Sequence, residues 1–350
     1  MRRAGTSGVW AGDSRRRAWA VASVAGAVVA TAFVGCSGGD EKVTSCEGQT
    51  LKASHGSAPT LQFAAFYIAE QEGYFDDAGV GLKITSLGNT DAAQALIGGS
   101  VDVVAGGFNV VLEATNRGGP IVSFATTSNR ATADIGIRSE DAPPDGANLR
   151  TSLSALKGLR IGVTSPGSNS DQLLRYLLID AGLDPDRDVE IIGTGGATEM
   201  VAAFAQKSID AYVIGPPNSD VAAEQGDGTV MLRLSSGVAP LLDDATNAVA
   251  TTSQRVLDNK SALVGCYATA LDRAVKLIHE HPDQAAAVLR DDFESLTDEQ
   301  WKVAWQGVVD ATPASAQMVP EQAEKAAGII GDATGEELDA SGAFTDELLR

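Results

Sequence analysis

The sequence predicts an α/β fold with two similar lobes, each a mixed sheet flanked by helices, followed by a helical C-terminal segment. Three observations predict this fold class. Beyond Cys46, short β-rich runs alternate with amphipathic helical runs, as in βαβ architecture. A second set of such runs resembles the first set at a fixed offset along the chain. From Ser253 onward the pattern is almost wholly helical.

The first set of elements follows Cys46. Its first helix has apolar Ala64, Ala65, Ile68 and Ala69 on one face, which is the spacing of an amphipathic helix. The alternation Leu-Lys-Ile-Thr at 82–85 is typical of a strand. In order, we expect a strand at 51–54, a helix at 61–72 that ends at Gly73, a strand at 82–85, a short helix capped by Asp91 that runs through Ile97, and strands at 101–104 and 121–125.

The second set follows a proline-rich surface turn at 141–146. The same alternation of patterns continues there, and further along Thr297 and Pro320 mark two good helix starts. We expect a strand at 159–163, a helix at 171–181, a strand at 189–192, a helix at 198–206 and a strand at 209–214.

The two sets are internally similar at an offset of 108 residues. Gly-Ser-Val-Asp-Val at 99–103 corresponds to Lys-Ser-Ile-Asp-Ala at 207–211, and Gly107 corresponds to Gly215. Each segment reads as the end of a helix, a Ser-(Val/Ile)-Asp turn, a buried strand and a glycine loop. Ligands of open α/β sheets lie beyond the carboxyl ends of the strands. Two such lobes that face each other would therefore form a cleft lined by these loops.

Small and hydroxyl- or amide-bearing residues fill the loops after the expected strands. Small residues let the backbone approach a ligand, and a helix N-terminus offers free N–H groups suited to an oxyanion or a carboxylate. The helix start at Ser168–Ser170 is the strongest such site. The predicted ligand-binding residues are His55, Ser57, Thr60, Gln62, Phe63, Gly107, Phe108, Asn109, Thr126, Thr127, Ser128, Ser165, Gly167, Ser168, Asn169, Ser170, Gly215, Pro216, Pro217 and Asn218.

Catalytic patterns are absent from the sequence. It contains no evident Ser/His/Asp or Cys/His order and no Gly-x-x-x-x-Gly-Lys phosphate loop. The cysteines and histidines lack metal-ligand spacing, so we expect neither a metal nor a cofactor. Phe63 and Phe108 could stack on a flat ligand. The pattern indicates a binding protein and leaves open whether it takes a small anion, which we favour, or a neutral aromatic ring.

Composition limits the partners. The 350 residues carry a formal net charge of −20, which argues against nucleic acid and against anionic lipid as charge-driven partners. Without residues 1–35 the chain would have 315 residues and a net charge of −24, because that segment holds five arginines and one aspartate. This length suffices for two lobes with proper cores.

The start of the chain has the organisation of an export signal. Basic residues up to Arg17 precede an uncharged stretch from Ala18 to Val34, and Gly35-Cys36 follows. The cysteine after a small residue resembles a bacterial lipobox, which implies cleavage before Cys36 and lipidation of its thiol. The stretch falls short of the ~20 apolar residues of a spanning helix, which disfavours a plain transmembrane anchor. Export by the general or the twin-arginine route stays open, since Arg15-Arg16 fits both.

Two further cysteines remain, Cys46 and Cys266. An even count in an oxidising compartment favours a disulfide between them over two free thiols. From the export signal and the lipobox we expect residues 1–35 to be a signal peptide. Residues 36–46, between the lipidated cysteine and the fold, are expected to be a flexible tether.

Four segments together resemble the nitrate/sulfonate/taurine-type solute-binding proteins, whose relatives bind thiamine-precursor pyrimidines. The resemblance covers roughly residues 50–290. Its motifs are the helix and aromatic pair at 62–75, Gly-Leu-Lys-Ile at 81–84, Ala-Leu-Ile-Gly-Gly-Ser-Val-Asp at 95–102, and Leu-Lys-Gly-Leu-Arg-Ile-Gly-Val at 156–163.

This resemblance implies a two-lobed periplasmic-binding-protein (Venus-flytrap) fold, with residues 47–126 plus 238–350 in lobe I and 127–237 in lobe II. It also implies capture of a small-molecule ligand between the lobes and delivery to the permease and ATPase subunits of an ABC importer, by an exported monomer anchored to the outer face of the membrane. Two other functions remain in view. A surface sensor domain is one, and an enzyme that makes the thiamine pyrimidine is the other, disfavoured because no cysteine lies between Cys46 and Cys266.

Overall fold

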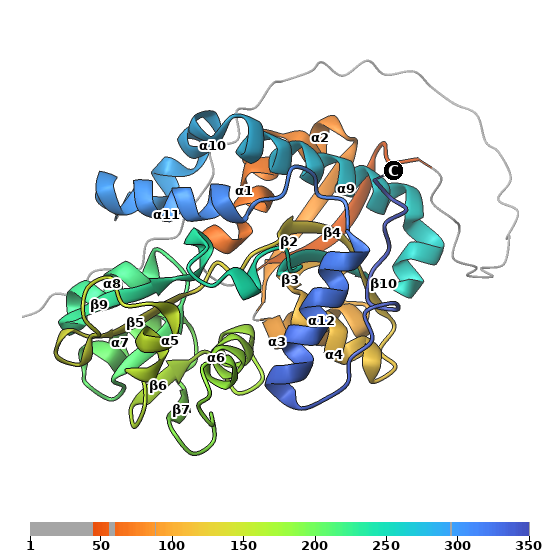
Figure 1. The fold of residues 1–350 in the computed structure, drawn as a ribbon. Helices are drawn as coiled ribbons and strands as arrows, with labels where there is room; N and C mark the ends of the chain where they lie inside the picture. Colours follow the sequence, from red (N-terminus) through yellow and green to blue (C-terminus); the bar gives the residue numbers. More distant parts are fainter. Residues whose placement is uncertain (1–44, 56–59, 88, 295, 350) are drawn as a thin grey trace, which may run out of the picture. The chain divides into compact units, whose positions relative to one another are not determined.

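Two five-stranded mixed sheets with the same strand topology form the framework of the computed structural model (Figure 1). The structure describes residues 45–55, 60–87, 89–294 and 296–349, and these described residues belong to one compact unit. The first sheet has the order β2 (Val80–Ser86), β1 (Gln49–His55), β3 (Val103–Gly107), β10 (Ala248–Ser253) and β4 (Ile121–Ser128). The second has the order β7 (Glu190–Gly193), β6 (Arg160–Val163), β8 (Ala211–Ile214), β5 (Asp134–Arg138) and β9 (Gly228–Arg233).

Parallel and antiparallel pairs occupy equivalent places in the two sheets. β1 is parallel to β2 and β3, and β6 is parallel to β7 and β8. The fourth strand of each sheet, β10 or β5, is antiparallel to both of its neighbours. The carboxyl ends of the parallel strands therefore fall on one edge of each sheet, which is where α/β folds bind ligands.

Helices cover both sheets. Around the first sheet lie η1 (Leu61–Phe63), α1 (Ala64–Gln71), α2 (Tyr74–Asp77), α3 (Asn89–Ile97), α4 (Phe108–Asn116) and α9 (Gln254–Glu280). Around the second lie η2 (Ser139–Asp141), α5 (Leu149–Ser154), α6 (Asn169–Asp180), α7 (Ala197–Ala205) and α8 (Asn218–Gly226), with η3 (Leu234–Ser236) and η4 (Pro240–Leu242) on the return path. The C-terminal part adds α10 (Pro282–Leu289), η5 (Arg290–Phe293), α11 (Asp298–Ala311) and α12 (Pro320–Thr334).

The repeat seen in the sequence is a repeat of structure. At the 108-residue offset, the bounds of α3 become those of α7, and β3 and β8 both begin at the matching residue. The turn between helix and strand is left-handed at the same place in both, with φ of 75° at Gly99 and 59° at Lys207. The predicted α/β fold class, with mixed sheets flanked by helices and a helical C-terminal segment, is confirmed.

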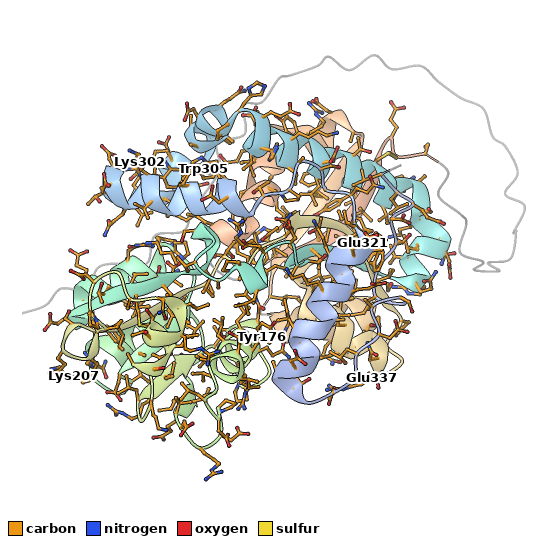
Figure 2. All side chains as sticks on the ribbon, in the orientation of Figure 1. Tyr176, Lys207, Lys302, Trp305, Glu321 and Glu337 are labelled. Atoms are coloured by element: carbon orange, nitrogen blue, oxygen red, sulfur yellow. A yellow bond between two sulfur atoms is a disulfide. The ribbon has the colours of Figure 1, made fainter. Side chains whose placement is uncertain are left out.

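The hydrophobic core joins the two sheets on one side. One cluster of buried residues runs from α3 and α4 of the first sheet through α12 to α5 and α6 of the second. Tyr176 of α6 lies on the side of that helix that faces α12 and packs against this cluster (Figure 2). A second cluster fills the opposite face of the first sheet under α1, α9, α10 and α11, and a third lies between the second sheet and α7 and α8.

A disulfide joins Cys46, just before β1, to Cys266 on α9, with the two Cα atoms 6.5 Å apart. The predicted pairing of these cysteines is thus present in the structure. In the part of the chain that the structure describes, no helix is both long enough and apolar enough to cross a membrane. Cys36 and the predicted signal peptide and tether up to residue 44 lie outside the described residues.

Several predicted elements need correction. β4 extends to Ser128, past the predicted end at 125, because its hydroxyl-bearing residues are buried on both faces of the strand. The boundary predicted between residues 126 and 127 therefore falls inside β4. The sequence patterns also failed to indicate α4, α8, β5, β9 and β10. α3 begins at Asn89, so the cap position predicted at 91 falls inside the helix.

Candidate functional site

A cavity of about 540 Å³ lies at the strand ends of both sheets. Most of the lining comes from segments that follow a strand and enter a helix. From the first half of the chain come Thr60, Leu61, Gln62, Phe63, Asn109 and Val110; from the second sheet come Thr132, Ala133, Thr164, Ser165, Pro166, Gly167, Ser168, Asn169, Ser170, Gly195, Gly196, Ala197, Val213, Ile214, Gly215, Pro216, Asn218 and Ser235; and α11 adds Gly307 and Val308.

More than half of the predicted ligand-binding residues line this cavity. They come from four of the five predicted loops, which lie far apart in the sequence and are brought together by the two sheets. These residues are Thr60, Gln62, Phe63, Asn109, Ser165, Gly167, Ser168, Asn169, Ser170, Gly215, Pro216 and Asn218.

The β4 residues of the predicted site do not line the cavity. Thr126, Thr127 and Ser128 are all buried within β4, and their hydroxyl groups donate to main-chain oxygens. A run of hydroxyl-bearing residues has the composition of a loop, so the sequence predicted a loop here. The sequence does not show that these hydroxyl groups are hydrogen-bonded inside a sheet.

Four other predicted residues also lie off the cavity wall, and a fifth is not described. Phe108 is 1% exposed and belongs to the core, so its ring is not available for stacking on a ligand. His55 packs edge-on against Tyr67, with ring centroids 5.3 Å apart. Gly107 and Pro217 are the N-cap residues of α4 and α8, behind the lining. Ser57 lies outside the described residues.

Several parts of the lining were not predicted from the sequence. Gly195, Gly196 and Ala197 follow β7, and the glycine-rich run at 193–196 between a strand and a helix is a visible signal for them. Thr132 and Ala133 precede β5, a strand that was not predicted. Gly307 and Val308 come from the middle of α11, and no local pattern distinguishes them from ordinary helix residues.

No described residue that lines the cavity carries a formal charge. One charged cluster includes neighbours of the lining residues Ala133 and Asn218 in the sequence, where Asp134 accepts hydrogen bonds from Ser219 Oγ at 2.6 Å and from Arg233 Nη1 at 3.0 Å. Arg233 also pairs with Asp220 at 2.5 Å. Burial raises the pKa of Asp134 to about 7, although the hydrogen bond from Ser219 and the charge of Arg233 act to lower it.

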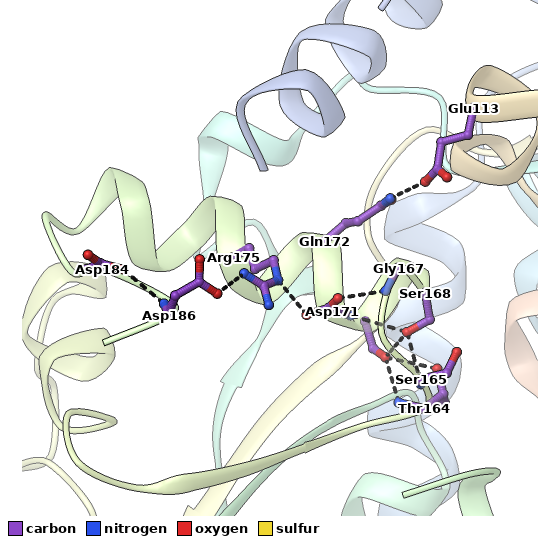
Figure 3. Close-up of polar contacts among 11 residues, drawn as sticks. Glu113, Thr164, Ser165, Gly167, Ser168, Asp171, Gln172, Arg175, Asp184 and Asp186 are labelled. Carbon is purple, nitrogen blue, oxygen red and sulfur yellow. Dashed lines mark hydrogen bonds and ion pairs between the residues drawn. The ribbon is translucent and has the colours of Figure 1, made fainter. Parts of the chain in front are cut away.

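The loop that enters α6 provides acceptors for several of its own donors (Figure 3). Ser168 Oγ accepts from the N–H of Asp171, and Ser170 Oγ accepts from the N–H of Thr164 at 3.1 Å. Asp171 Oδ2 accepts from the N–H of Gly167 at 2.7 Å, while its Oδ1 binds Arg175 Nε at 2.9 Å. The helix start that the sequence favoured as an anion site thus already holds a carboxylate of the chain.

Other helix starts at the cavity have no side-chain cap. The N-cap residues of η1, α4, α7 and α8 are Thr60, Gly107, Gly196 and Pro217, and no side-chain hydrogen bond caps any of these four. The first N–H groups of a helix lack partners within the helix and must be satisfied by caps, water or ligands. The cavity is therefore rich in main-chain donors, and its described lining is free of cationic side chains.

Direct contacts link the two walls beside the cavity. Asn169 Nδ2 donates to Asn247 Oδ1 at 3.1 Å, and Gln172 Nε2 of α6 donates to Glu113 of α4. Arg130 lies where the chain first crosses between the sheets, where it donates to the carbonyl oxygen of Ser235 at 2.9 Å and does not line the cavity. Among the residues with described positions, no group of three or more His, Cys, Asp or Glu side chains could hold a metal ion.

Comparisons with known proteins agree with this architecture. A family model described as "NMT1/THI5 like" matches residues 60–285. The bicarbonate transport ATP-binding protein CmpC of Synechococcus elongatus is 31% identical over 190 residues, which are 49% of this chain and 28% of that protein. The nitrate/nitrite binding protein NrtA of Nostoc is 25% identical over 194 residues, which are 48% of this chain and 41% of that protein. The chain spans less than half the length of these curated relatives.

A solved structure is similar over most of the chain. The alkanesulfonate-binding protein SsuA from Xanthomonas axonopodis pv. citri, bound to MOPS, superposes with a TM-score of 0.66 at 16% identity. The match covers 84% of this chain and 96% of that one, and it shows a shared fold. Because the family model covers well over half of the sequence, the chain belongs to the NMT1/THI5-like family.

Proposed function

We propose that this protein is the extracytoplasmic solute-binding component of an ABC importer and captures a small solute in the cavity between its two sheets. The observation that carries the proposal is the cavity itself, which is lined from both sheets by helix starts with uncapped main-chain donors. The names of the similar proteins refer to bicarbonate, nitrate and alkanesulfonate, all of which are small anions.

A small anion fits this site better than a flat neutral ring. Helix N-termini favour negative charge through their free N–H groups and dipoles. The alternative ligand, a pyrimidine or another aromatic ring, depends on stacking by Phe63 and Phe108. Phe63 is 2% exposed and Phe108 is 1% exposed, so both rings are held in the core. The described lining also lacks Cys, His, Lys, Asp and Glu, which supports binding over acid–base catalysis.

Export and anchoring belong to the same proposal. A signal segment at 1–35 and a lipid on Cys36 would hold the protein at the outer face of the membrane, beside the permease and ATPase subunits that receive its ligand. The disulfide at Cys46 leaves residues 37–45 as the link between lipid and fold. Replacing Cys36 with Ser should release the protein from the membrane fraction, whereas unchanged membrane association would contradict the anchor.

A thermal-shift screen tests the binding function. The panel should hold alkanesulfonates, nitrate, bicarbonate, carboxylates and a hydroxymethylpyrimidine. A ligand that binds the folded state alone raises the unfolding temperature, and the rise increases with its affinity and concentration. We expect a concentration-dependent rise with at least one anion. No shift with any member of the panel would contradict the proposal.

A further inference from the structure

The first turn of α4 is one of the parts of the cavity wall where main-chain donors are left without partners in the described structure. Gly107, its N-cap residue, has no side chain to offer, and the N–H of Phe108 donates to the carbonyl oxygen of Asn247 at 2.8 Å. The N–H groups of Asn109 and Val110 find no acceptor among the described residues, and both residues line the cavity. Two main-chain donors are thus available to a ligand at this point.

The side chain of Asn109 is a second and independent sign of a ligand. Asn109 is 3% exposed, and its Nδ2 atom is buried without any hydrogen-bond partner in the described structure. A buried amide donor without a partner is costly, so such groups are normally satisfied by the protein, by water or by a ligand. Because Asn109 lines the cavity, an acceptor atom of the ligand can supply the missing bond.

Gly107 makes room for this side chain. A Cβ atom added at Gly107 would lie 2.5 Å from Asn109 Oδ1, which is closer than real Cβ contacts come. The backbone of Gly107, with φ of −82° and ψ of 141°, is open to any residue. A side chain at this position would therefore force Asn109 to shift, so glycine serves here through space and not through conformation, and it helps to position Asn109.

Acidic residues distinguish the two walls. The first turns of α6, α7 and α8, on the second sheet, contain Asp171, Glu199 and Asp220 respectively. The first turns of η1 and α4, on the first sheet, contain no acidic residue. A carboxylate in the first turn already offsets the positive end of a helix, and it repels a second negative group.

We propose that the ligand is an organic molecule with a single acid group, and that this group binds at the N-terminus of α4, on Asn109 Nδ2 and the free N–H groups. This inference rests on the proposed function and names its ligand class. One acid group is specified because no cationic side chain is found in the described lining and the opposite helix starts carry acids. An organic body is specified because a cavity of about 540 Å³, with Val110, Ile214 and Val308 in its wall, leaves room beyond the acid group.

Calorimetric titration of the wild type and two asparagine variants tests this assignment. The probes are 1-butanesulfonate and butyrate, the matched diacid 1,4-butanedisulfonate, nitrate, and a neutral hydroxymethylpyrimidine. Asn109→Leu keeps the size of the side chain but removes the donor. The matched control is Asn148→Leu, at the exposed N-cap of α5, where the Asn148 side chain accepts from the N–H of Thr151 at 2.9 Å and is remote from the cavity lining.

We expect at least one of the two monoacids to bind the wild type, and to bind more tightly than the diacid, nitrate or the pyrimidine. Asn109→Leu should weaken that binding by about 10-fold or more, since it removes a bond to a charged group. It should not lower the unfolding temperature, because the lost donor had no partner. Asn148→Leu should lower the unfolding temperature and leave the affinity unchanged.

Two results would overturn the assignment. One is monoacid binding that is equally tight in Asn109→Leu, and the other is tighter binding of the diacid, of nitrate or of the pyrimidine. Either result would leave solute binding itself intact. A complete lack of binding by the wild type across the panel would instead contradict the proposed function.

Discussion

Asp102 and Asp210 make the same hydrogen bond at equivalent points of the two sheets. Asp102 Oδ2 accepts from the N–H of Lys52, and Asp210 Oδ2 accepts from the N–H of Arg160, at 3.0 Å in both cases. Both the aspartates and their partners are 108 residues apart. Each aspartate also holds a cation, Lys260 Nζ at 3.1 Å for Asp102 and Arg160 Nη2 at 2.6 Å for Asp210. The aspartate of the repeated Ser-(Val/Ile)-Asp turn thus ties the start of β3 to β1 and the start of β8 to β6.

Replacing Asp102 or Asp210 with Ala should destabilise the protein to a similar extent. Each change leaves a main-chain N–H without its acceptor and a cation without its partner, which costs about 1–3 kcal/mol. Urea unfolding of the two single variants gives the comparison, and Glu224→Ala, at an exposed position of α8, is a suitable control. A loss well below 0.5 kcal/mol for either aspartate, roughly the size of an ordinary surface substitution, would contradict the structural role of the turn.

The buried Asp134 should make stability depend on pH. Its pKa is raised to about 7 in the folded state, so between about pH 4 and pH 7 the folded state holds a proton that the unfolded state has lost. The contribution of this group to stability is therefore fully present below that window and is lost as the pH rises through it.

Asp134→Asn should remove this pH dependence. The wild type should lose up to about 2–3 kcal/mol more than the variant between about pH 5 and pH 7.5, at about 1.4 kcal/mol for each unit of pKa difference. Urea midpoints of both proteins at the two pH values measure the difference. Parallel pH profiles would show that Asp134 titrates near its ordinary pKa.

Loss of the disulfide should destabilise the start of the fold. Cys46 and Cys266 are 220 residues apart in the sequence, so their bond restricts the unfolded chain strongly. Cys46→Ser combined with Cys266→Ser should lower the free energy of unfolding by about 2–4 kcal/mol. Reductant should destabilise the wild type and leave the double variant unchanged, and equal stability of the two under oxidising conditions would count against the bridge.

The hydrogen bond between Gln172 and Glu113 should influence ligand affinity, although neither residue lines the cavity. Gln172→Glu places two carboxylates together where α6 meets α4, which disfavours the approach of the two cavity walls. We expect affinity for the bound anion to fall by about 10-fold, or about 1.4 kcal/mol, at neutral pH. The loss should lessen as the pH falls and the pair takes up a proton.

The exchanged pair, Gln172→Glu with Glu113→Gln, is the control for this prediction, because it restores one amide and one carboxylate. Its affinity should return towards that of the wild type. Equal affinities for all three proteins would show that this contact does not contribute to binding.

Local patterns in the sequence predict a large part of the fold. The 108-residue repeat, the helix that begins after Ser168 and the pairing of Cys46 with Cys266 can all be recognised from the residues alone. β10 was missed because its six residues are all buried, so they show no alternation of apolar and polar positions. α4 was missed because Phe108-Asn109 after two glycines has the composition of a loop.

The chemistry of the site was less accessible from the sequence than its location. Ser168–Ser170 was correctly placed at a helix start, but Asp171 and Ser170 occupy donors of that loop through bonds that no sequence pattern reveals. Conversely, nothing in the sequence distinguishes Asn109 from the other polar residues of the predicted loops. The structure singles it out, because its Nδ2 atom is buried without a described partner and its side chain lies beside Gly107.

A crystal structure of the protein with the anion that binds most tightly in the thermal-shift screen is the most direct test of the central claim. We predict that the ligand lies in the cavity between the two sheets, with an acid oxygen within hydrogen-bond distance of Asn109 Nδ2. A ligand found elsewhere on the protein would contradict the account of this cavity as the solute-binding site.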